Sequence, residues 1–359
     1  MNGRCPNVGK LTAVNEPGAV VARDLVKVFA KGSVRALDGL SFEVEAGTVF
    51  GLLGPNGSGK TTAVRILSTI LTPDEGSASI LGNDVVKRAA VVRRSIGLAG
   101  QYATVDENLT GHENLRMVGR LSHLEKKAAS TRADELLGQF GLADAANRTL
   151  KTYSGGMRRR LDLAAALVGR PPVLFLDEPT TGLDPQSRQD LWVVIEQLVG
   201  VGTTVLLTTQ YLEEADRLAH QLLVIDHGKA IAEGTPAELK ATLGTTVVSV
   251  TFADSATAER AVGLLDPLVA GSPILDGNSV DLTVEAGPKV AAEALRTLDQ
   301  HQVEVAGLAL REPSLDDVFL SLTGHRSEGL EFDEPEQGGD HKAAPTPGYI
   351  GFDENLAGR

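Results

Sequence analysis

One eight-residue stretch constrains this chain more than any other. Residues 54–61 read GPNGSGKT and match G-x-x-x-x-G-K-[ST], a pattern whose glycines let successive backbone N–H groups turn toward phosphate oxygens. An apolar run of strand length, Thr48–Leu53, precedes the loop, and a helical pattern, Thr61–Leu71, follows it. The loop is therefore expected at a helix N-terminus, where the helix dipole favours an anion. The alternative is a chance glycine-rich turn.

The loop provides most of the expected nucleotide-binding groups. Lys60 is expected to neutralise the β and γ phosphates, and the Thr61 hydroxyl is expected to ligate Mg²⁺. The implied cofactors are therefore ATP and Mg²⁺. The expected phosphate-binding residues are Gly54, Pro55, Asn56, Gly57, Ser58, Gly59, Lys60, Thr61 and Thr62.

Two carboxylates follow a second apolar run. Residues 173–178 read VLFLDE, so Asp177 and Glu178 should emerge at the C-terminal end of a buried parallel strand, beside the phosphate loop of a doubly wound fold. We expect Asp177 to hold Mg²⁺ directly or through water. We expect Glu178 to orient or deprotonate the attacking water, a contribution typically worth about 10²–10⁴ in rate. Alone the motif is weak, because apolar strands often end in Asp-Glu before a proline turn.

A third motif, YSGGM at residues 153–157, precedes a helical pattern over Arg158–Val168. Ser154 stands where a helix N-cap should, and Gly155 and Gly156 leave the backbone N–H groups bare. The sequence thus predicts a second anion site, on a different strand–loop–helix unit from the first. A plain capped helix start explains the same residues.

The chain divides into four segments by pattern. Residues 1–19 are expected to be a flexible lead, and residues 20–240 alternate short apolar runs with helical patterns, as in an α/β domain with a largely parallel sheet. Within this domain, residues 110–169 are mostly helical and begin with a capping box formed by Thr110 and Glu113. We therefore predict a helical subdomain inserted between strands of the core.

A small accessory domain is expected over residues 241–325. Its pattern suggests a βαββαβ order and a ferredoxin-like α+β fold. The expected elements are Thr245–Phe252, Ala256–Leu265, Pro267–Leu275, Ser279–Val284, Lys289–Leu298 and Val303–Leu310. A short helix, Ser314–Leu322, should follow with Ser314 as its cap. Residues 326–359 are rich in Gly, Pro, Glu and Asp, and are expected to be a disordered acidic tail.

Composition narrows the classes of partner. The formal net charge is -13, which argues against a broad nucleic-acid surface, because such surfaces need clustered basic residues. The single cysteine, Cys5, fits a reducing cytoplasm. No run of about 18 apolar residues is present. If the protein works at a membrane, we therefore expect a partner to supply the membrane-spanning segments.

The order of these motifs resembles that of the ABC ATPase family over residues 20–240. The series is the phosphate loop, Gln101, Ser-Gly-Gly, Asp-Glu and then GLD at residues 182–184. The resemblance implies an ATPase in which the Ser-Gly-Gly signature of one subunit closes on the γ-phosphate bound by the other subunit. Because this chain has one copy of each motif, two copies of this chain, or this chain and a paralogue, must meet; a homodimer is the expectation.

The resemblance also suggests roles for single residues. Gln101 matches the family's Q-loop, which would reach Mg²⁺ and the water, while Tyr102–Val105 would touch the membrane partner; an exposed loop glutamine is the alternative. Phe29 matches the aromatic residue that stacks on adenine, a contact worth about 1–3 kcal/mol, although it can equally be a core residue. Asp184 matches the loop that crosses the dimer seam.

One position departs from the family pattern. After the expected strand Thr203–Thr208, the family usually has a histidine that bonds the γ-phosphate, whereas here Thr209 is followed by Gln210. Glutamine donates and accepts hydrogen bonds but cannot carry a proton charge. Hydrolysis is therefore less firmly implied than ATP binding, and Lys60, Glu178 and Gln210 form the expected catalytic set.

A closer resemblance is to ATP-binding subunits of the daunorubicin-resistance type. It rests on SGGMRRRLDL (154–163), TTQYLEEAD (208–216) and REPSLDDVFL (311–320), and this subfamily shares the glutamine at the position of Gln210. It implies export of a hydrophobic natural product through a separate permease at the cytoplasmic face of the cell membrane. The arginines 158–160 form either a functional patch or, for two of the three, solvated surface.

Two other functions remain open at this level. Gln210 is compatible with an ATP-binding regulatory module of little turnover. A soluble ABC protein acting on ribosomes or DNA is the second, but such proteins commonly carry two ATP modules or a long coiled coil, and the sequence shows neither.

Overall fold

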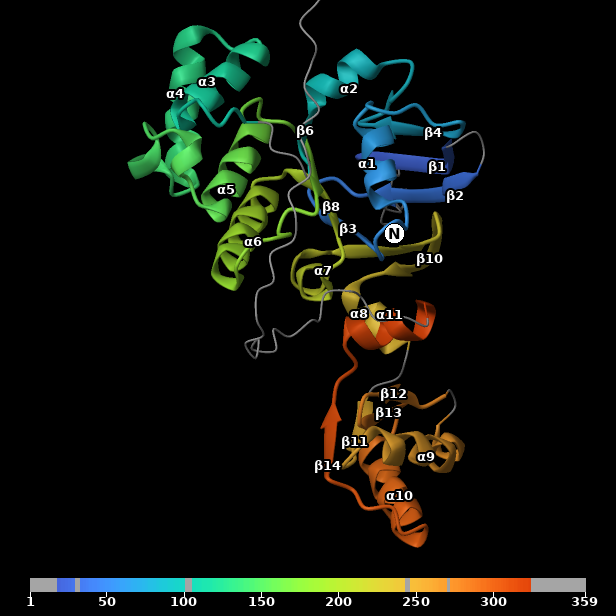
Figure 1. The fold of residues 1–359 in the computed structure, drawn as a ribbon. Helices are drawn as coiled ribbons and strands as arrows, with labels where there is room; N and C mark the ends of the chain where they lie inside the picture. Colours follow the sequence, from blue (N-terminus) through green and yellow to red (C-terminus); the bar gives the residue numbers. More distant parts are fainter. Residues whose placement is uncertain (1–17, 30–32, 101–104, 243–245, 270–271, 324–359) are drawn as a thin grey trace, which may run out of the picture. The chain divides into compact units, whose positions relative to one another are not determined.

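The computed structural model describes residues 18–29, 33–100, 105–242, 246–269 and 272–323 (Figure 1). The expected N-terminal lead, apart from Gly18 and Ala19, lies outside these residues, as does the expected acidic tail. No helix within these ranges combines the length and the apolar character needed to cross a membrane.

A mostly parallel six-stranded sheet forms the centre of the larger domain. Its order is β10-β9-β3-β8-β7-β6, and β10 joins the edge antiparallel to β9. The strands are β3 (Val49–Leu53), β6 (Ile96–Ala99), β7 (Val173–Asp177), β8 (Thr204–Thr209), β9 (Gln221–Asp226) and β10 (Lys229–Gly234). All residues of β3, β7 and β8 are buried, as continuous apolar runs in a parallel sheet require. The predicted α/β class is confirmed.

A second, antiparallel sheet of order β2-β1-β4-β5 was not predicted from the sequence. Its strands are β1 (Val20–Phe29), β2 (Val34–Val44), β4 (Glu75–Ile80) and β5 (Asn83–Asp84). Phe42 of β2 stacks on Phe50 of β3 with ring centroids 5.3 Å apart, so the two sheets share one core. Helix α1 (Lys60–Leu67) packs in that core and is shorter than expected, because Thr69 adopts a left-handed φ of 66° that ends the helical run.

The predicted helical insertion between β6 and β7 is confirmed (Figure 1). It contains α3 (Gly111–Leu121), α4 (Lys126–Gln139) and α5 (Gly155–Ala166), with 3₁₀ turns at Ala143–Ala145 and Leu150–Thr152; α2 (Ala89–Ser95) precedes β6. The capping box of Thr110 and Glu113 forms as predicted. Helix α5 starts at Gly155 rather than Arg158, because the Ser154 hydroxyl accepts a hydrogen bond from the Met157 N–H.

Three further helices belong to this domain: α6 (Pro185–Gly200), α7 (Leu212–Leu218) and α8 (Pro236–Ala241). Asp184 caps α6 through the Ser187 N–H, and Pro185 occupies the first turn, where its missing N–H costs nothing. Trp192 of α6 is almost fully buried in the core that includes the insertion.

The C-terminal domain has the predicted βαββαβ order and a four-stranded antiparallel sheet, β12-β13-β11-β14. Its elements are β11 (Thr246–Thr251), α9 (Ser255–Leu265), a 3₁₀ turn (Asp266–Leu268), β12 (Ile274–Asp276), β13 (Ser279–Val284), α10 (Gly287–Gln300) and β14 (Gly307–Arg311). The expected strand Pro267–Leu275 was wrong over most of its length. Pro267 lies in the 3₁₀ turn, and only the end of the stretch pairs with β13.

Helix α11 (Leu315–Thr323) returns from the C-terminal domain to the larger one. Leu315, Val318 and Phe319 are buried in a cluster with Leu53 of β3 and residues of α7, β9 and α8. Ser314 acts as the predicted N-terminal cap by accepting from the Asp317 N–H. The boundary at residues 241–325 stays a prediction, but α11 already shows that the segment covers part of the larger domain's core.

Candidate active site

The phosphate loop connects the end of β3 to the start of α1, as predicted. Gly57 and Gly59 have φ of 82° and 115°, a backbone region that side chains with a Cβ rarely adopt. A Cβ on Gly59 would also lie 2.5 Å from the Ala36 carbonyl oxygen, so this turn requires glycine for space as well. The loop is thereby fixed directly before the first turn of α1.

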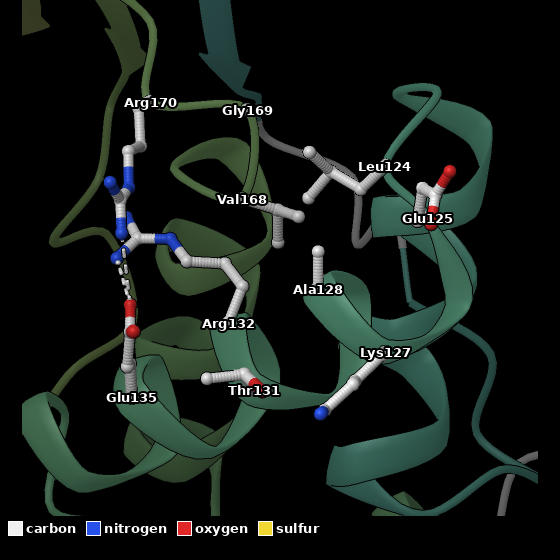
Figure 2. A pocket seen from close by; sticks show the side chains of 10 residues that line it. All are labelled: Leu124, Glu125, Lys127, Ala128, Thr131, Arg132, Glu135, Val168, Gly169 and Arg170. Atoms are coloured by element: carbon white, nitrogen blue, oxygen red, sulfur yellow. Dashed lines mark hydrogen bonds and ion pairs between the residues drawn. The ribbon is translucent and has the colours of Figure 1, made fainter.

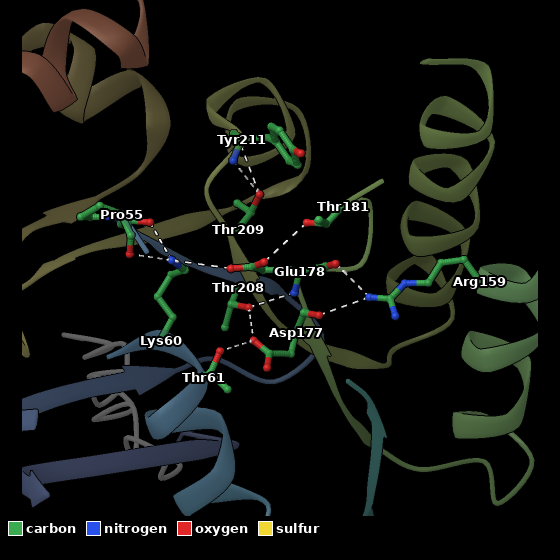
Figure 3. A network of polar contacts seen from close by, with 11 residues as sticks. Pro55, Lys60, Thr61, Arg159, Asp177, Glu178, Thr181, Thr208, Thr209 and Tyr211 are labelled. Atoms are coloured by element: carbon green, nitrogen blue, oxygen red, sulfur yellow. Dashed lines mark hydrogen bonds and ion pairs between the residues drawn. The ribbon is translucent and has the colours of Figure 1, made fainter. Parts of the chain in front are cut away.

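The Lys60 ammonium lies over this loop (Figure 3). Nζ donates to the carbonyl oxygens of Gly54 (2.7 Å) and Pro55 (3.0 Å) and lies 3.8 Å from Glu178 Oε1. Only 4% of Lys60 is exposed. Burial lowers the pKa of the Lys60 ammonium, and the negative charges of Glu178 and Asp177 oppose that shift. A buried ammonium held between loop carbonyls and carboxylates is well placed to receive an anionic phosphate.

Asp177, the last residue of β7, is held by two hydroxyl groups. Its Oδ1 accepts from Thr208 Oγ1 at 2.6 Å and from Thr61 Oγ1 at 3.2 Å. The structure thus brings together the two residues expected to hold the metal on the described part of the chain. Thr208 was not singled out from the sequence, because threonine is common in strands and gives no separate signal there.

Glu178 occupies a strained position directly after β7. Its φ is 49°, a left-handed value that costs a non-glycine residue free energy and is found mostly where surrounding contacts enforce it. Here the Glu178 N–H donates to the carbonyl oxygen (3.1 Å) and the hydroxyl (3.0 Å) of Thr208 on the neighbouring strand. The side chain, 9% exposed, is directed toward Lys60 and Thr181 (Figure 3).

These groups border a cavity of about 170 Å³. The lining residues are Ala36, Asn56, Gly57, Gly59, Lys60, Thr61, Thr62 and Glu178. The volume is below the roughly 300–1,000 Å³ typical of a complete ligand pocket, so this chain alone encloses only a part of a nucleotide. The lining matches the phosphate end.

Two of the three signature residues are exposed, and Gly156 is buried. Ser154 and Gly155 are exposed, and neither lines the cavity of the same chain. A Cβ on Gly156 would meet the Ser187 hydroxyl at 2.5 Å, which places the start of α5 against the start of α6. Asp184, exposed at the α6 cap, is therefore close to the signature in the same subunit.

Three other expected residues have different outcomes. Gln101 and its neighbours Tyr102–Thr104 lie outside the described residues, and Val105 is buried at 8% exposure. Phe29 is 37% exposed at the end of β1, which excludes a plain core position, and the Lys27 ammonium lies over its ring, 5.8 Å from the ring centroid. Gln210 follows β8, and among the described residues its buried Oε1 has no hydrogen-bond partner.

Glu214 was missed by the sequence analysis. It is fully buried on α7, and its Oε1 accepts from the Trp192 indole N–H at 3.1 Å. Burial raises the pKa of the Glu214 carboxyl, while Thr209, Trp192, Thr180 and Arg188 oppose the shift. The motif EEAD contained this residue, but sequence alone does not distinguish it from its exposed neighbour Glu213.

A larger hollow of about 630 Å³ lies on the helical insertion (Figure 2). It lies between α4 and the end of α5, and Glu135 there pairs with Arg132 and Arg170 at 3.0 and 3.2 Å. These ion pairs are partly exposed, and the lining contains no nucleophile or base set beside an anion-binding loop. The expected residues Lys60 and Glu178 line the smaller cavity instead.

A phosphate loop, a buried lysine and two carboxylates at the end of a parallel strand define a P-loop nucleotide-hydrolysing domain. The ABC transporter family matches residues 37–181, and the C-terminal domain of DrrA1-3-like ATP-binding proteins matches residues 234–323. A daunorubicin resistance ATP-binding protein of Streptomyces coeruleorubidus is 54% identical over 305 residues, covering 84% of this chain and 95% of the relative. The daunorubicin/doxorubicin resistance ATP-binding protein of Streptomyces peucetius is 49% identical, covering 88% and 96%.

More distant proteins are also similar to this chain in sequence or fold. A Nod factor export ATP-binding protein of Paraburkholderia xenovorans is 40% identical, covering 87% of this chain and 99% of the relative. The structure of cbiO1 from Clostridium perfringens, part of an ABC transporter complex, gives a TM-score of 0.58 at 25% identity and covers 63% of this chain and 92% of that one. The chain therefore belongs to the ABC transporter ATP-binding proteins, in the daunorubicin-resistance group, and is an ATPase coupled to transport.

Proposed function

We propose that this chain hydrolyses Mg²⁺-bound ATP in a homodimer and thereby drives a separate permease that exports a hydrophobic, drug-like natural product. The observation that carries the proposal is the grouping of Lys60 and Glu178 at one cavity, with Asp177 bonded to Thr61 of the same lining. Relatives at about half identity are named for daunorubicin and doxorubicin resistance, which favours that class of substrate. The subunit would work at the cytoplasmic face of the membrane, held there by the permease.

Thr61 and Asp177 fit a magnesium ion. A hydroxyl and a carboxylate oxygen 3.2 Å apart are the oxygen donors that Mg²⁺ prefers. Thr208 holds the same carboxylate oxygen from the other side and so orients it. When bound, Mg²⁺ would offset the negative charge of the β and γ phosphates. Gln101 remains the proposed additional ligand.

Glu178 is proposed to orient the attacking water and to take its proton. Its carboxylate lies 3.8 Å from the Lys60 ammonium, and the strained backbone holds it at the cavity. Lys60 and the loop N–H groups would stabilise the charge that develops on the γ-phosphate, which is the main source of catalysis in phosphoryl transfer. Gln210 would take the place of histidine: its side-chain N–H₂ can donate to the γ-phosphate, and its Oε1, which has no partner among the described residues, can accept from the attacking water.

A second subunit would complete each site. The cavity is too small for a whole nucleotide, while Ser154 and Gly155 are exposed on another face of the same chain. We propose that the signature of one subunit closes over the phosphates held by the other, with Asp184 at the seam and Phe29 stacking on adenine. A closed dimer then opens after hydrolysis, and this cycle moves the permease.

Glu178→Gln tests the proposal. It keeps the size and shape of the side chain but removes its charge and cannot take a proton, so ATP binding should persist and hydrolysis should fall by about 10²–10⁴. With saturating Mg²⁺-ATP the variant should elute as a dimer in size-exclusion chromatography. Glu213→Gln, at an exposed site on α7, is the control and should behave like wild type. A monomeric Glu178→Gln variant in saturating ATP would contradict the shared-site dimer.

A regulatory module with little turnover is the second candidate, because Gln210 replaces the usual histidine. Phosphate release by the wild-type protein together with its permease separates the two. Turnover well above background, and a permease-dependent fall in daunorubicin accumulation that requires Glu178, support the exporter. Binding of ATP without phosphate release supports the regulatory module.

A further inference from the structure

Arg159 on α5 is the most extensively bonded arginine near the site (Figure 3). Its Nε donates to the Pro179 carbonyl oxygen (2.6 Å) and its Nη1 to that of Gly100 (2.6 Å). Its Nη2 donates to the carbonyl oxygens of Glu178 (2.9 Å) and Asp177 (3.2 Å). One guanidinium thus binds the backbone on both sides of the proposed catalytic base.

The two neighbouring arginines do not share this arrangement. Arg158 pairs with Glu107 at 3.1 Å, and Arg160 reaches the Phe140 carbonyl at 3.4 Å, so both contact the helical insertion. The Nε atoms of Arg158 and Arg160 are buried with no partner among the described residues. All three arginines are half-buried, and 38% of the Arg158 side chain is exposed.

The bonded carbonyls belong to two separate loops. Gly100 follows β6 and directly precedes Gln101, whereas residues 177–179 carry the proposed metal ligand and base. Four carbonyl oxygens at these positions need a planar fork of N–H donors, which arginine has and lysine lacks. Burial lowers the pKa of Arg159, but the nearby acids Asp162, Asp177, Glu214 and Glu178 oppose the shift and favour the charged form.

We infer that Arg159 is a positioning residue that links the two ATP sites of the dimer. The inference rests on the proposed shared-site dimer, in which Ser154 of this chain serves the nucleotide held by the other subunit. Through Arg159, the same helix holds the backbone of this subunit's own Glu178.

Helix α5 can transmit a displacement from Ser154 to Arg159. Ser154 caps α5, and Arg159 follows five residues later, about 7.5 Å along the axis at the usual helical rise. A displacement of the helix start on contact with the partner's phosphate therefore moves the guanidinium. Glu178 responds because it has a left-handed φ of 49° and depends on its neighbours to stay there. Occupation of one site thus sets the geometry of the base in the other.

Cooperativity of ATP hydrolysis tests the link. With two coupled sites the Hill coefficient for ATP can rise above 1 and approach about 2. Arg159→Lys keeps the charge and the aliphatic stem. In this variant the Hill coefficient for ATP should fall to about 1, and the maximal rate of hydrolysis should also fall. The affinity of the monomer for nucleotide should stay unchanged. Arg159→Gln should show the same loss of cooperativity. Melting temperatures establish that both variants are folded.

Arg132→Lys is the matched control. Arg132 also donates from its guanidinium to a carbonyl at the end of α5, that of Leu167 at 3.0 Å, but it does not bond the loops at the active site. This variant should keep the wild-type Hill coefficient.

Two results would overturn the inference. One is a folded Arg159→Lys variant with the wild-type coefficient, and the other is a wild-type enzyme that hydrolyses ATP with a coefficient of 1. Both leave the ATPase proposal standing, whereas the absence of any ATP-dependent dimer would overturn the shared-site proposal and the link together.

Discussion

At the scale of single residues, the buried acid Glu214 makes the stability of the protein depend on pH. It contacts Trp192 of α6 and lies next to Thr209, the last residue before Gln210. Its side chain is fully buried, so the folded state favours the neutral carboxylic acid. Through Thr209 and Trp192, the Glu214 side chain thus joins the end of β8 to α6.

The pH dependence of stability follows from this shift. The folded-state pKa of Glu214 is raised above its ordinary value of 4.5, so above that pH the unfolded chain releases a proton that the folded chain retains. The free energy of unfolding must therefore fall as pH rises through the window between the two pKa values, by at most about 1.4 kcal/mol per pH unit. Below the window Glu214 adds no pH dependence, because both states are protonated.

Glu214→Gln should remove that slope. The amide does not titrate, and its oxygen can still accept from the Trp192 indole. We expect the stability of wild type relative to Glu214→Gln to decrease from pH 5 upward, measured by urea unfolding at a series of pH values. A stability difference that is constant or grows with pH would show that the carboxyl is charged in the folded protein.

Gln210 is the second residue whose role can be measured directly. If its amide binds the γ-phosphate as that group leaves, Gln210→Ala should lower kcat about ten- to a hundredfold, the value of a lost hydrogen bond to a charged group, with little change in ATP affinity. Gln210→His should remain active. Steady-state phosphate release with the permease present decides this. In a degenerate site, alanine would change nothing and histidine would raise the rate sharply.

At the scale of elements, α11 connects the two domains through a buried apolar cluster at one end and ion pairs at the other. Phe319 is 2% exposed in the cluster that includes Leu53, one residue before the phosphate loop. At the other end, Arg311 of β14 bonds Asp317 of α11 and Asp281 of β13 at 2.5 and 2.6 Å. The ion pairs therefore hold α11 against the C-terminal sheet, while its apolar face packs on β3, the strand that ends at the phosphate loop.

Phe319→Ala should destabilise the larger domain. Truncation of a buried phenylalanine typically costs about 3–5 kcal/mol, and the lost contacts lie against β3 and its neighbours. Thermal unfolding should show a lower melting temperature, and ATP should restore part of it by binding the folded state. Removal of residues 326–359 is the control and should leave the melting temperature nearly unchanged. An unaltered melting temperature in Phe319→Ala would show that α11 contributes little.

The elements also show what sequence alone can predict. Strand β3, the Ser154 cap and the order of the C-terminal strands follow from local patterns, and the structure confirms them. The antiparallel sheet was missed because its strands are partly exposed and give no continuous apolar run. Arg159 was missed for a different reason. Three consecutive arginines look alike in sequence, and tertiary packing alone determines which one meets the carbonyls.

At the scale of the whole molecule, each ATP site is proposed to take its phosphate loop from one subunit and its signature from the other. Lys60→Ala should abolish nucleotide binding, because it removes the buried ammonium at the phosphate end. Gly155→Asp should spare the fold, since a Cβ there meets nothing within 4 Å and an acid is favoured in the first turn of a helix. In the closed dimer, however, its carboxylate would repel the partner's phosphates.

Mixing these two variants should restore phosphate release if the sites are shared between subunits, and should not restore it if each subunit has a self-contained site. Each homodimer carries the same defect in both sites and should be inactive. In a mixed dimer one site collects both defects and the other has an intact loop facing an intact signature. Random pairing makes about half of the dimers mixed, so independent sites would give about a quarter of wild-type turnover, and coupled sites less. Phosphate release from the mixture, compared with each variant alone, measures this. A Gly138→Asp variant, with the same charge added at an open glycine of α4, controls for charge and should be fully active. A mixture no more active than its components, with both variants folded, would contradict independent shared sites.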